Sequence, residues 1–308
     1  MRKLSASILS LMSGLAAPCF AQVVLYDNGG VITTPTGACI PVGGSSSLLQ
    51  VVGTIPNGYY GYSHMLTATN NNRIADDFVV PAPGWNIATI EVLDYQTNAP
   101  SATSTITGMN VRIWNGKPGV AGSQVVYGDV LTNRLTASVF TNIYRLGSTC
   151  DLKRALFKST VNINTSLAPG TYWLDWQAIG SANYSGPWSP VVTITGQRNK
   201  PGSNGIQSLD GGNTWIPIID DGVAPEFLSP PLPQDLPFVI NGTVGSACAA
   251  NCDGSTTVPV LTANDFQCFL NNYAAGLSSA NCDGSTAVPI LTANDFQCFL
   301  NHYATGCS

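Results

Sequence analysis

The stretch NCDGSTTVPVLTANDFQCFLNNYAAG, residues 251–276, recurs almost unchanged as NCDGSTAVPILTANDFQCFLNHYATG, residues 281–306. Only four of the 26 aligned positions differ between the two copies. An internal repeat of this kind is the signature of one small structural unit used twice. The chain therefore ends in two copies of a cysteine-bearing unit, and the rest of the sequence is best interpreted around it.

The second half of each copy is predicted to be a helix. Thr262 and Asp265 have the spacing of a capping box, and Gly276 and Gly306 are placed to end the two helices. Apolar residues recur at the spacing of one helix face. They are Phe266, Phe269, Leu270 and Tyr273, matched by Phe296, Phe299, Leu300 and Tyr303.

The first half of each copy is predicted to be a loop rich in side-chain oxygens. Asn251, Asp253 and Ser255 occupy alternate positions, and Asp265 follows in the helix. Hard oxygen ligands in a loop closed by a carboxylate are what Ca²⁺ requires. A thiolate zinc site is the competing interpretation, but the cysteine spacing does not fit it.

Two tandem loop–helix units in this style resemble a dockerin domain, and in detail the cysteine-containing GC-type dockerins. The resemblance covers residues 248–308, about a fifth of the chain. It implies an EF-hand-like duplicated module that binds Ca²⁺, with Thr262 at the position of a water-mediated ligand. The implied second site consists of Asn281, Asp283, Ser285, Thr292 and Asp295.

The loop departs from the family pattern in two ways. It is longer than a standard loop, and Gly254 follows the second ligand instead of the third. A shifted register, in which Asp253 and Gly254 take the fifth and sixth positions, is the alternative. Both registers keep Asn251, Asp253 and Asp265 as ligands.

The cysteines are predicted to form disulfides, because nine minus Cys19 leaves an even number in an exported chain. Six of them lie in the last 61 residues and allow many pairings. Repeat symmetry favours one pairing within each copy and one that clasps the ends of the module. The predicted bridges are Cys252–Cys268, Cys282–Cys298, Cys248–Cys307 and, in the large region, Cys39–Cys150.

The resemblance also implies a protein partner. Dockerins bind a cohesin on a scaffold or cell surface, so a cohesin-like partner is expected, and two near-identical repeats would allow docking in two orientations. Helix positions off the apolar face are the expected contacts: Gln267, Asn271, Gln297 and Asn301. The competing hypothesis is a disulfide-rich stability cap with no partner.

The N-terminal stretch MRKLSASILSLMSGLAAPCFAQ, residues 1–22, has the form of a signal peptide. Arg2 and Lys3 precede an apolar run, which predicts cleavage after Ala21. A lipoprotein signal through Cys19 is a weaker alternative, because Pro18 stands where a small residue is preferred. No later run is long and apolar enough to span a membrane. We expect a secreted protein, with attachment at the cell surface as the consequence of docking.

Residues 22–244 are predicted to form one domain and residues 245–308 another. The first region consists of short β segments between turn residues, as in NIATIEVLDYQ (86–96) and GTYWLDWQ (170–177). This pattern predicts a mainly β fold, an antiparallel β-sandwich or jelly roll. Charged residues make up only 9% and the net charge is −5, so nucleic acid is not an expected partner.

The sequence contains no catalytic motif that we could identify, and the sandwich is predicted to be non-catalytic. Asp76–Asp77 and Asp220–Asp221 are adjacent carboxylates, which on a strand point to opposite faces. His64 is expected to be a surface or structural residue. Two alternatives remain: a carbohydrate-binding module that uses exposed tryptophans to hold a polysaccharide, and a glycoside hydrolase. The tryptophans that could hold a polysaccharide are Trp173, Trp188 and Trp215, but each of them is expected to lie in the core of the sandwich.

Overall fold

The computed structural model describes most of the chain after the predicted signal peptide, whose residues 1–21 lie outside the described part. Cys39, Cys248 and Cys307 also lie outside it, so the bridges predicted for them are not described. The described residues are 22–34, 40–222, 231–244, 250–255, 259–283, 285 and 288–306.

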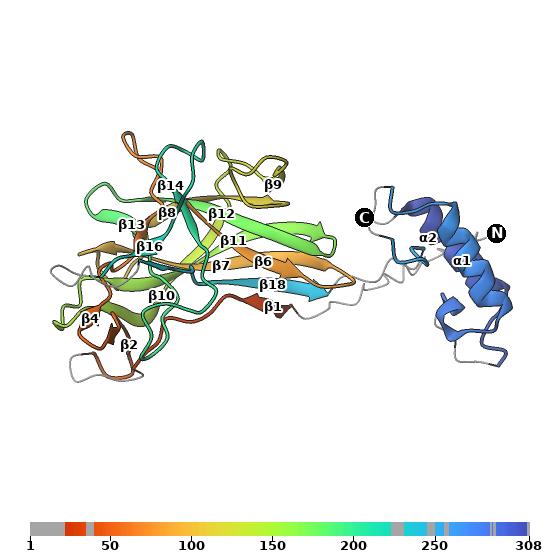
Figure 1. Cartoon of the computed structure of the whole chain (residues 1–308), viewed down its shortest axis with the longest axis horizontal. Helices are drawn as coiled ribbons and strands as arrows, with labels where there is room; N and C mark the ends of the chain where they lie inside the picture. The colour runs from red at the N-terminus through yellow and green to blue at the C-terminus, as the bar shows by residue number, and fades with distance from the viewer. Residues whose placement is uncertain are drawn as a thin grey trace, which may run out of the picture.

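The described chain is mainly β, with two helices near its C-terminal end, as the sequence predicted (Figure 1). Over the described residues, one large sheet has the strand order β1 (Val23–Asp27), β18 (Phe238–Val244), β7 (Trp85–Thr97), β11 (Ala155–Leu167), β10 (Leu135–Leu146) and β2 (Ser45–Leu48). Two further strands extend it beside β7, namely β13 (Ser185–Ser189) and β5 (Tyr62–Ser63).

The second large sheet has six strands within the described ranges. Their order is β15 (Ile216–Pro217), β14 (Ile206–Ser208), β6 (Arg73–Val80), β12 (Gly170–Gly180), β8 (Ile106–Trp114) and β9 (Val125–Gly128). Two further sheets of two strands each are present among the described residues. They are β16 (Ile219–Asp220) with β17 (Leu232–Pro233), and β3 (Val51–Val52) with β4 (Ile55–Pro56).

The two large sheets enclose one apolar core, which makes this region a β-sandwich. Strand β12 shows how the sequence builds it, because Leu174 and Trp176 are fully buried in the core between the sheets. Trp173, one position away, packs in a separate cluster with Ala75 and Ile206 on the other face of the sheet. This alternation confirms the predicted period of two along the strand.

One edge of the sandwich differs from the expected antiparallel arrangement. Strand β2 pairs with β10 in parallel, with Ser45 opposite Ile143 and Leu48 opposite Leu146. Parallel neighbours need a long connection, and here the chain passes through seven other strands between β2 and β10. Sequence periodicity does not report strand direction, which explains why it did not reveal this edge.

The C-terminal region has its own small core. Helices α1 (Ala263–Ala274) and α2 (Ala293–Thr305) are joined through the short 3₁₀ helix η1 (Ser278–Ala280). The buried apolar residues of this region, Ala250, Phe269, Ala280 and Phe299, form a cluster that includes no residue of the β region. The cores of the two regions are thus separate. The boundary predicted at residue 245 falls in 245–249, outside the described residues, and stays a prediction.

Candidate metal and docking site

Each helix of the repeat begins with the predicted capping box. Thr262 is the N-cap of α1, and its hydroxyl accepts a hydrogen bond from the Asn264 backbone N–H, 3.2 Å away. The Asp265 carboxylate reaches back and accepts from the Thr262 backbone N–H at 2.8 Å. Thr292 and Asp295 repeat this arrangement at the start of α2. These bonds satisfy donors that a helix start otherwise leaves unpaired.

The end of α1 is also as predicted. Gly276 has a φ of +67°, a conformation that favours glycine. Its N–H donates to the Tyr273 carbonyl, and the Leu277 N–H donates to the Asn272 carbonyl. This pair of bonds is the Schellman motif, which ends the helix at this glycine.

The same carboxylate ties the loop to the helix. Asp265 Oδ1 accepts a hydrogen bond from the Asp253 backbone N–H at 3.2 Å, and Asp295 Oδ1 accepts one from Asp283 N–H at the same distance. Asp253 Oδ1 in turn accepts from the Ser255 backbone N–H at 2.8 Å. Three of the predicted ligand residues therefore meet in one hydrogen-bonded turn in each repeat.

One predicted ligand atom in each copy is buried without a hydrogen-bond partner. The amide oxygens of Asn251 and Asn281 are both in this state. Their amide nitrogens are engaged, since each donates to the carbonyl of the serine four residues later, Ser255 or Ser285, at 2.9 and 2.8 Å. A buried acceptor without a donor costs free energy, and a hard cation is one group that satisfies it.

The serine and threonine oxygens predicted as ligands have other roles. The Ser255 hydroxyl donates to the Val260 carbonyl at 3.1 Å, and the Ser285 hydroxyl donates to the Ile290 carbonyl at the same distance. The Thr262 hydroxyl caps α1. The residues that best fit a cation are therefore the Asn and Asp positions common to both predicted registers: Asn251, Asp253, Asp265, Asn281, Asp283 and Asp295.

The closing carboxylates are buried and favour their charged form. Burial acts to raise the pKa of Asp265, but the backbone N–H groups of Thr262 and Asp253 outweigh it and hold that pKa below its usual value. The balance is the same at Asp295, whose backbone donors include Thr292 and Asp283. Both side chains therefore offer carboxylate oxygens at neutral pH.

Disulfides join each loop to its helix, as the repeat symmetry predicted. Cys252 pairs with Cys268 and Cys282 pairs with Cys298, each across 16 residues. Cys150 is also disulfide-bonded. The sulfurs of the second bridge lie near the His302 ring, and these three form the one cluster of His, Cys, Asp and Glu with metal-binding spacing among the described residues. Because both cysteines are oxidised, they are not thiolate ligands.

The two helices pack through their phenylalanines in a nearly symmetric way. Phe269 stacks on Phe299 with ring centroids 4.2 Å apart. The reciprocal pairs Phe266–Phe299 and Phe269–Phe296 have almost equal separations of 6.1 and 6.0 Å. Equal reciprocal contacts are what a twofold relation between the repeats produces.

The predicted docking residues are exposed and matched between the copies. Gln267 donates to Asn271 at 3.0 Å on α1, and Gln297 donates to Asn301 at 2.9 Å on α2. Leu270 corrects the predicted apolar face, because it is 36% exposed while its neighbour Phe269 is buried. The reason is geometric: the helices meet through their aromatic rings, and Leu270 is left at the rim of this contact.

The residues considered for chemistry in the sandwich are largely buried. Trp173 is buried, and Trp188 and Trp215 are half-buried, so none of the three is exposed. His64 is fully buried, which excludes the surface alternative and agrees with the structural one, and the Ala178 N–H in β12 donates to its backbone carbonyl. Burial lowers the pKa of His64 to about 3, and its ring is therefore neutral.

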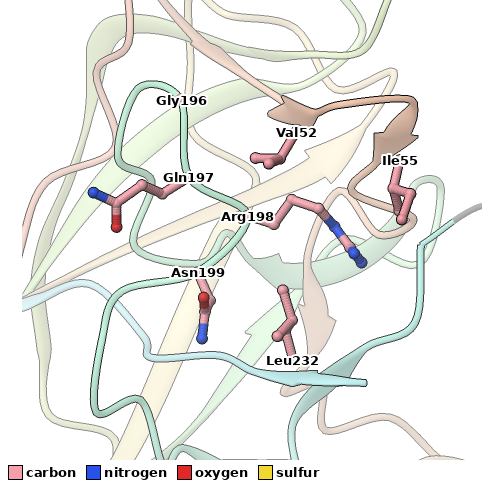
Figure 2. A pocket seen from close by; sticks show the side chains of 7 residues that line it. All are labelled: Val52, Ile55, Gly196, Gln197, Arg198, Asn199 and Leu232. Atoms are coloured by element: carbon pink, nitrogen blue, oxygen red, sulfur yellow. The ribbon is translucent and has the colours of Figure 1, made fainter. Parts of the chain in front are cut away.

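An open pocket of about 330 Å³ lies beside the β3–β4 hairpin (Figure 2). Val52, Ile55 and Leu232 line it together with the loop residues Gly196, Gln197, Arg198 and Asn199. Arg198 is buried and forms an ion pair with Asp220 at 3.0 Å. Asp220 also accepts hydrogen bonds from the Gly58 and Gly222 backbones, so this carboxylate holds loops together. None of the predicted site residues lines the pocket.

The sequence did not reveal a polar cluster of the sandwich in which the buried side chains of Asn28, Asp76 and Asp235 meet the partly exposed Lys200. Its members are far apart in the chain and belong to no recognisable motif. In the sequence, Asp76 stands out only as half of the adjacent carboxylate pair Asp76–Asp77.

No protein-family model matches the chain, and the search of the curated proteins gave no match either. The resemblance to dockerins therefore rests on the residues of the repeat. Over the part of the chain that the structure describes, no helix is long and apolar enough to cross a membrane.

Proposed function

We propose that residues 245–308 form a dockerin-type docking module that binds Ca²⁺ and attaches an exported, non-catalytic β-sandwich to a cohesin-like protein at the cell surface. The observation that carries the proposal is the duplicated loop, in which the same Asn oxygen is buried without a partner in both copies. The exposed amide pairs on both helices and the symmetric ring packing support a surface that docks in two orientations.

In this proposal the ion would be held by Asn251, Asp253 and Asp265 in the first repeat and by the equivalent residues in the second. A bound cation would join the loop to the start of the helix, because these residues belong to both. Each site has two carboxylates, which favours modest affinity. The disulfides hold the loop near the helix when the ion is absent.

The calcium test follows melting of the full chain in Ca²⁺ and in chelator. Ca²⁺ at about 100 times its Kd should stabilise the module by about 2.7 kcal/mol per site. Asn251→Ala with Asn281→Ala should abolish this gain. Ser255→Ala with Ser285→Ala is the matched control, since it also removes one side-chain donor to a backbone carbonyl per repeat. Equal melting in Ca²⁺ and chelator would overturn the metal site.

The docking test measures retention of the exported full chain at the cell surface. Replacement of Gln267, Asn271, Gln297 and Asn301 by Ala should weaken retention while the melting temperature is unchanged, because all four are exposed. Asn162→Ala, an exposed amide on the sandwich, is the control and should leave retention intact. Retention that survives the four changes would make the module a stability cap.

A further inference from the structure

The polar cluster formed by Asn28, Asp76, Lys200 and Asp235 brings an amine and a carboxamide into contact. Asn28 directly follows β1, and Lys200 lies in the loop between β13 and β14, 172 positions away. Lys200 Nζ donates to Asn28 Oδ1 at 2.8 Å and to the Asn28 backbone carbonyl at 3.0 Å. The amine thus contacts the oxygen of the side-chain amide, which is one bond from Cγ.

Two carboxylates flank this pair. Asn28 Nδ2 donates to Asp76 Oδ2 at 2.9 Å, and Lys200 Nζ lies 2.9 Å from Asp235 Oδ2. Asp76 is fully buried in β6. Burial, and next the charge of Asp235, raise the pKa of Asp76 well above its usual value, which favours a protonated carboxyl beside the amide nitrogen.

The cluster is bordered by aromatic rings on one side. The Tyr26 hydroxyl donates to Asn28 Oδ1 at 3.0 Å. The Tyr26 ring lies against Phe238, Phe78 and Trp85, with centroids 5.6, 6.2 and 6.4 Å away. This apolar border keeps water from the Asn28 side of the cluster and strengthens the hydrogen bonds there, whereas Lys200 reaches it from a partly exposed loop, with its side chain 31% exposed.

We propose that Lys200 and Asn28 join through an amide bond between their side chains, formed by the folded protein itself. The amine and the amide are held in contact by the fold, which replaces an encounter between two molecules by a step within one. Asp76 would act as the acid and base of the reaction, because its carboxyl contacts the nitrogen that leaves.

The proposed step balances without a co-reactant. Lys200 gives one proton to Asp235, and its nitrogen lone pair attacks Cγ of Asn28. The charge that develops on Oδ1 is stabilised by the Tyr26 hydroxyl. The Asp76 proton passes to Nδ2, the Cγ–Nδ2 bond breaks, and ammonia leaves while the new nitrogen returns a proton to Asp76. Ammonia takes up the proton held by Asp235, so the lysine's positive charge leaves as ammonium.

The simpler alternative is that Lys200 and Asp235 form an ordinary ion pair that Asn28 supports. The two hypotheses differ in covalent mass. If the amide bond forms, the mass of the folded protein is lower than the mass calculated from its sequence by one ammonia, about 17 Da. The amide bond also predicts that proteolysis releases one joined peptide containing both Asn28 and Lys200.

The experiment is intact mass spectrometry and peptide mapping of the reduced, full-length exported protein. Peptide mapping is essential because an N-terminal Gln22 that cyclises would also lose ammonia. A joined Asn28–Lys200 peptide is the expected result. Recovery of unmodified Asn28 and Lys200 in separate peptides from the folded protein would overturn the proposal.

Three variants assign the roles. Lys200→Arg keeps the charge but should restore the full mass at this site, whereas the control Lys158→Arg, which alters a lysine paired with Glu91, should keep the joined peptide. Asp76→Asn should fold without forming the bond. If Asp76→Asn does not fold, Lys200→Arg still tests the bond itself. A joined peptide in folded Asp76→Asn would overturn the role of Asp76.

Discussion

The sandwich and the C-terminal module reach stability by different routes. Among the described residues, the main sandwich core has 21 buried apolar residues, whereas the module core has four. A unit as small as the module buries too little apolar surface to stand on packing alone. It adds one disulfide and one capping box to each repeat. The comparison teaches that covalent and capping bonds replace core volume in the smaller region.

Loss of the module disulfides should have the largest effect on the stability of the module relative to that of the sandwich. Each closes a loop of 16 residues and is worth about 3 kcal/mol in the entropic model. Replacing Cys252, Cys268, Cys282 and Cys298 by Ser should therefore remove the module's melting transition and leave that of the sandwich in place. Scanning calorimetry of the full chain checks this. Substitution is preferable to reduction, because Cys150 is also disulfide-bonded. An unchanged module transition would mean that its core suffices.

The second largest effect is expected at the ring pair of the module. Phe269→Ala removes one of four buried apolar residues and its stack on Phe299, at a cost of about 3–5 kcal/mol. Leu270→Ala, at the next position of the same helix, is the comparison and should cost only about 1 kcal/mol, since Leu270 is 36% exposed and lies outside the buried cluster. Thermal melting of both variants measures the difference. A similar loss in both would show that Leu270 also belongs to the core.

The two regions should respond differently to pH. Burial, opposed by the Ser159 hydroxyl, raises the pKa of Asp94 in the sandwich to about 7. Between about pH 4 and 7 the folded state keeps this proton while the unfolded state loses it, so Asp94 lowers stability as pH rises. Asp94→Asn should therefore stabilise the sandwich more at pH 7 than at pH 4. His64 has the opposite effect, because its lowered pKa costs stability as pH falls below about 6.5.

In the module, the direction in which stability changes with pH is set by Asp265 and Asp295, whose folded pKa values are lowered. Their contribution is present above about pH 4 and is lost as the pH falls through the folded values. Urea unfolding of wild type and Asp94→Asn at pH 4 and 7 tests the sign for the sandwich, and unfolding of the wild-type module at pH 2 and 7 tests the sign for the module. A sandwich difference that does not change between pH 4 and 7 would contradict the raised pKa of Asp94.

The smallest effect is expected from removing the N-cap hydroxyl of either helix in the module. Thr262→Ala should cost about 1 kcal/mol, since the hydroxyl satisfies one backbone donor of α1. Thr292→Ala should cost the same because the second repeat has the same geometry. Thermal melting of the two variants compares the repeats directly. Unequal losses would show that the copies differ in stability although only four of their 26 aligned residues differ.

Local features of the module could be predicted from the sequence. The helix start at Thr262, its end at Gly276 and the bridge from Cys252 to Cys268 depend on residues at most 16 positions apart. The exposure of Leu270 could not be predicted from the sequence, because it depends on how closely the second helix approaches the first. For the same reason the sequence did not distinguish the serine hydroxyls, which bond to backbone, from the asparagine oxygens left without a partner.

By itself the sequence determined the β-rich class, the repeated loop–helix unit, its caps and its internal disulfides. Each of these follows from periodicity or from groups a few residues apart, which a single chain reveals. The tertiary structure alone decided the parallel edge at β2, the burial of His64 and the meeting of Asn28 with Lys200. These depend on which strands pair and how two sheets stack, and such long-range contacts leave no pattern along the chain because their free energy comes from packing between distant segments.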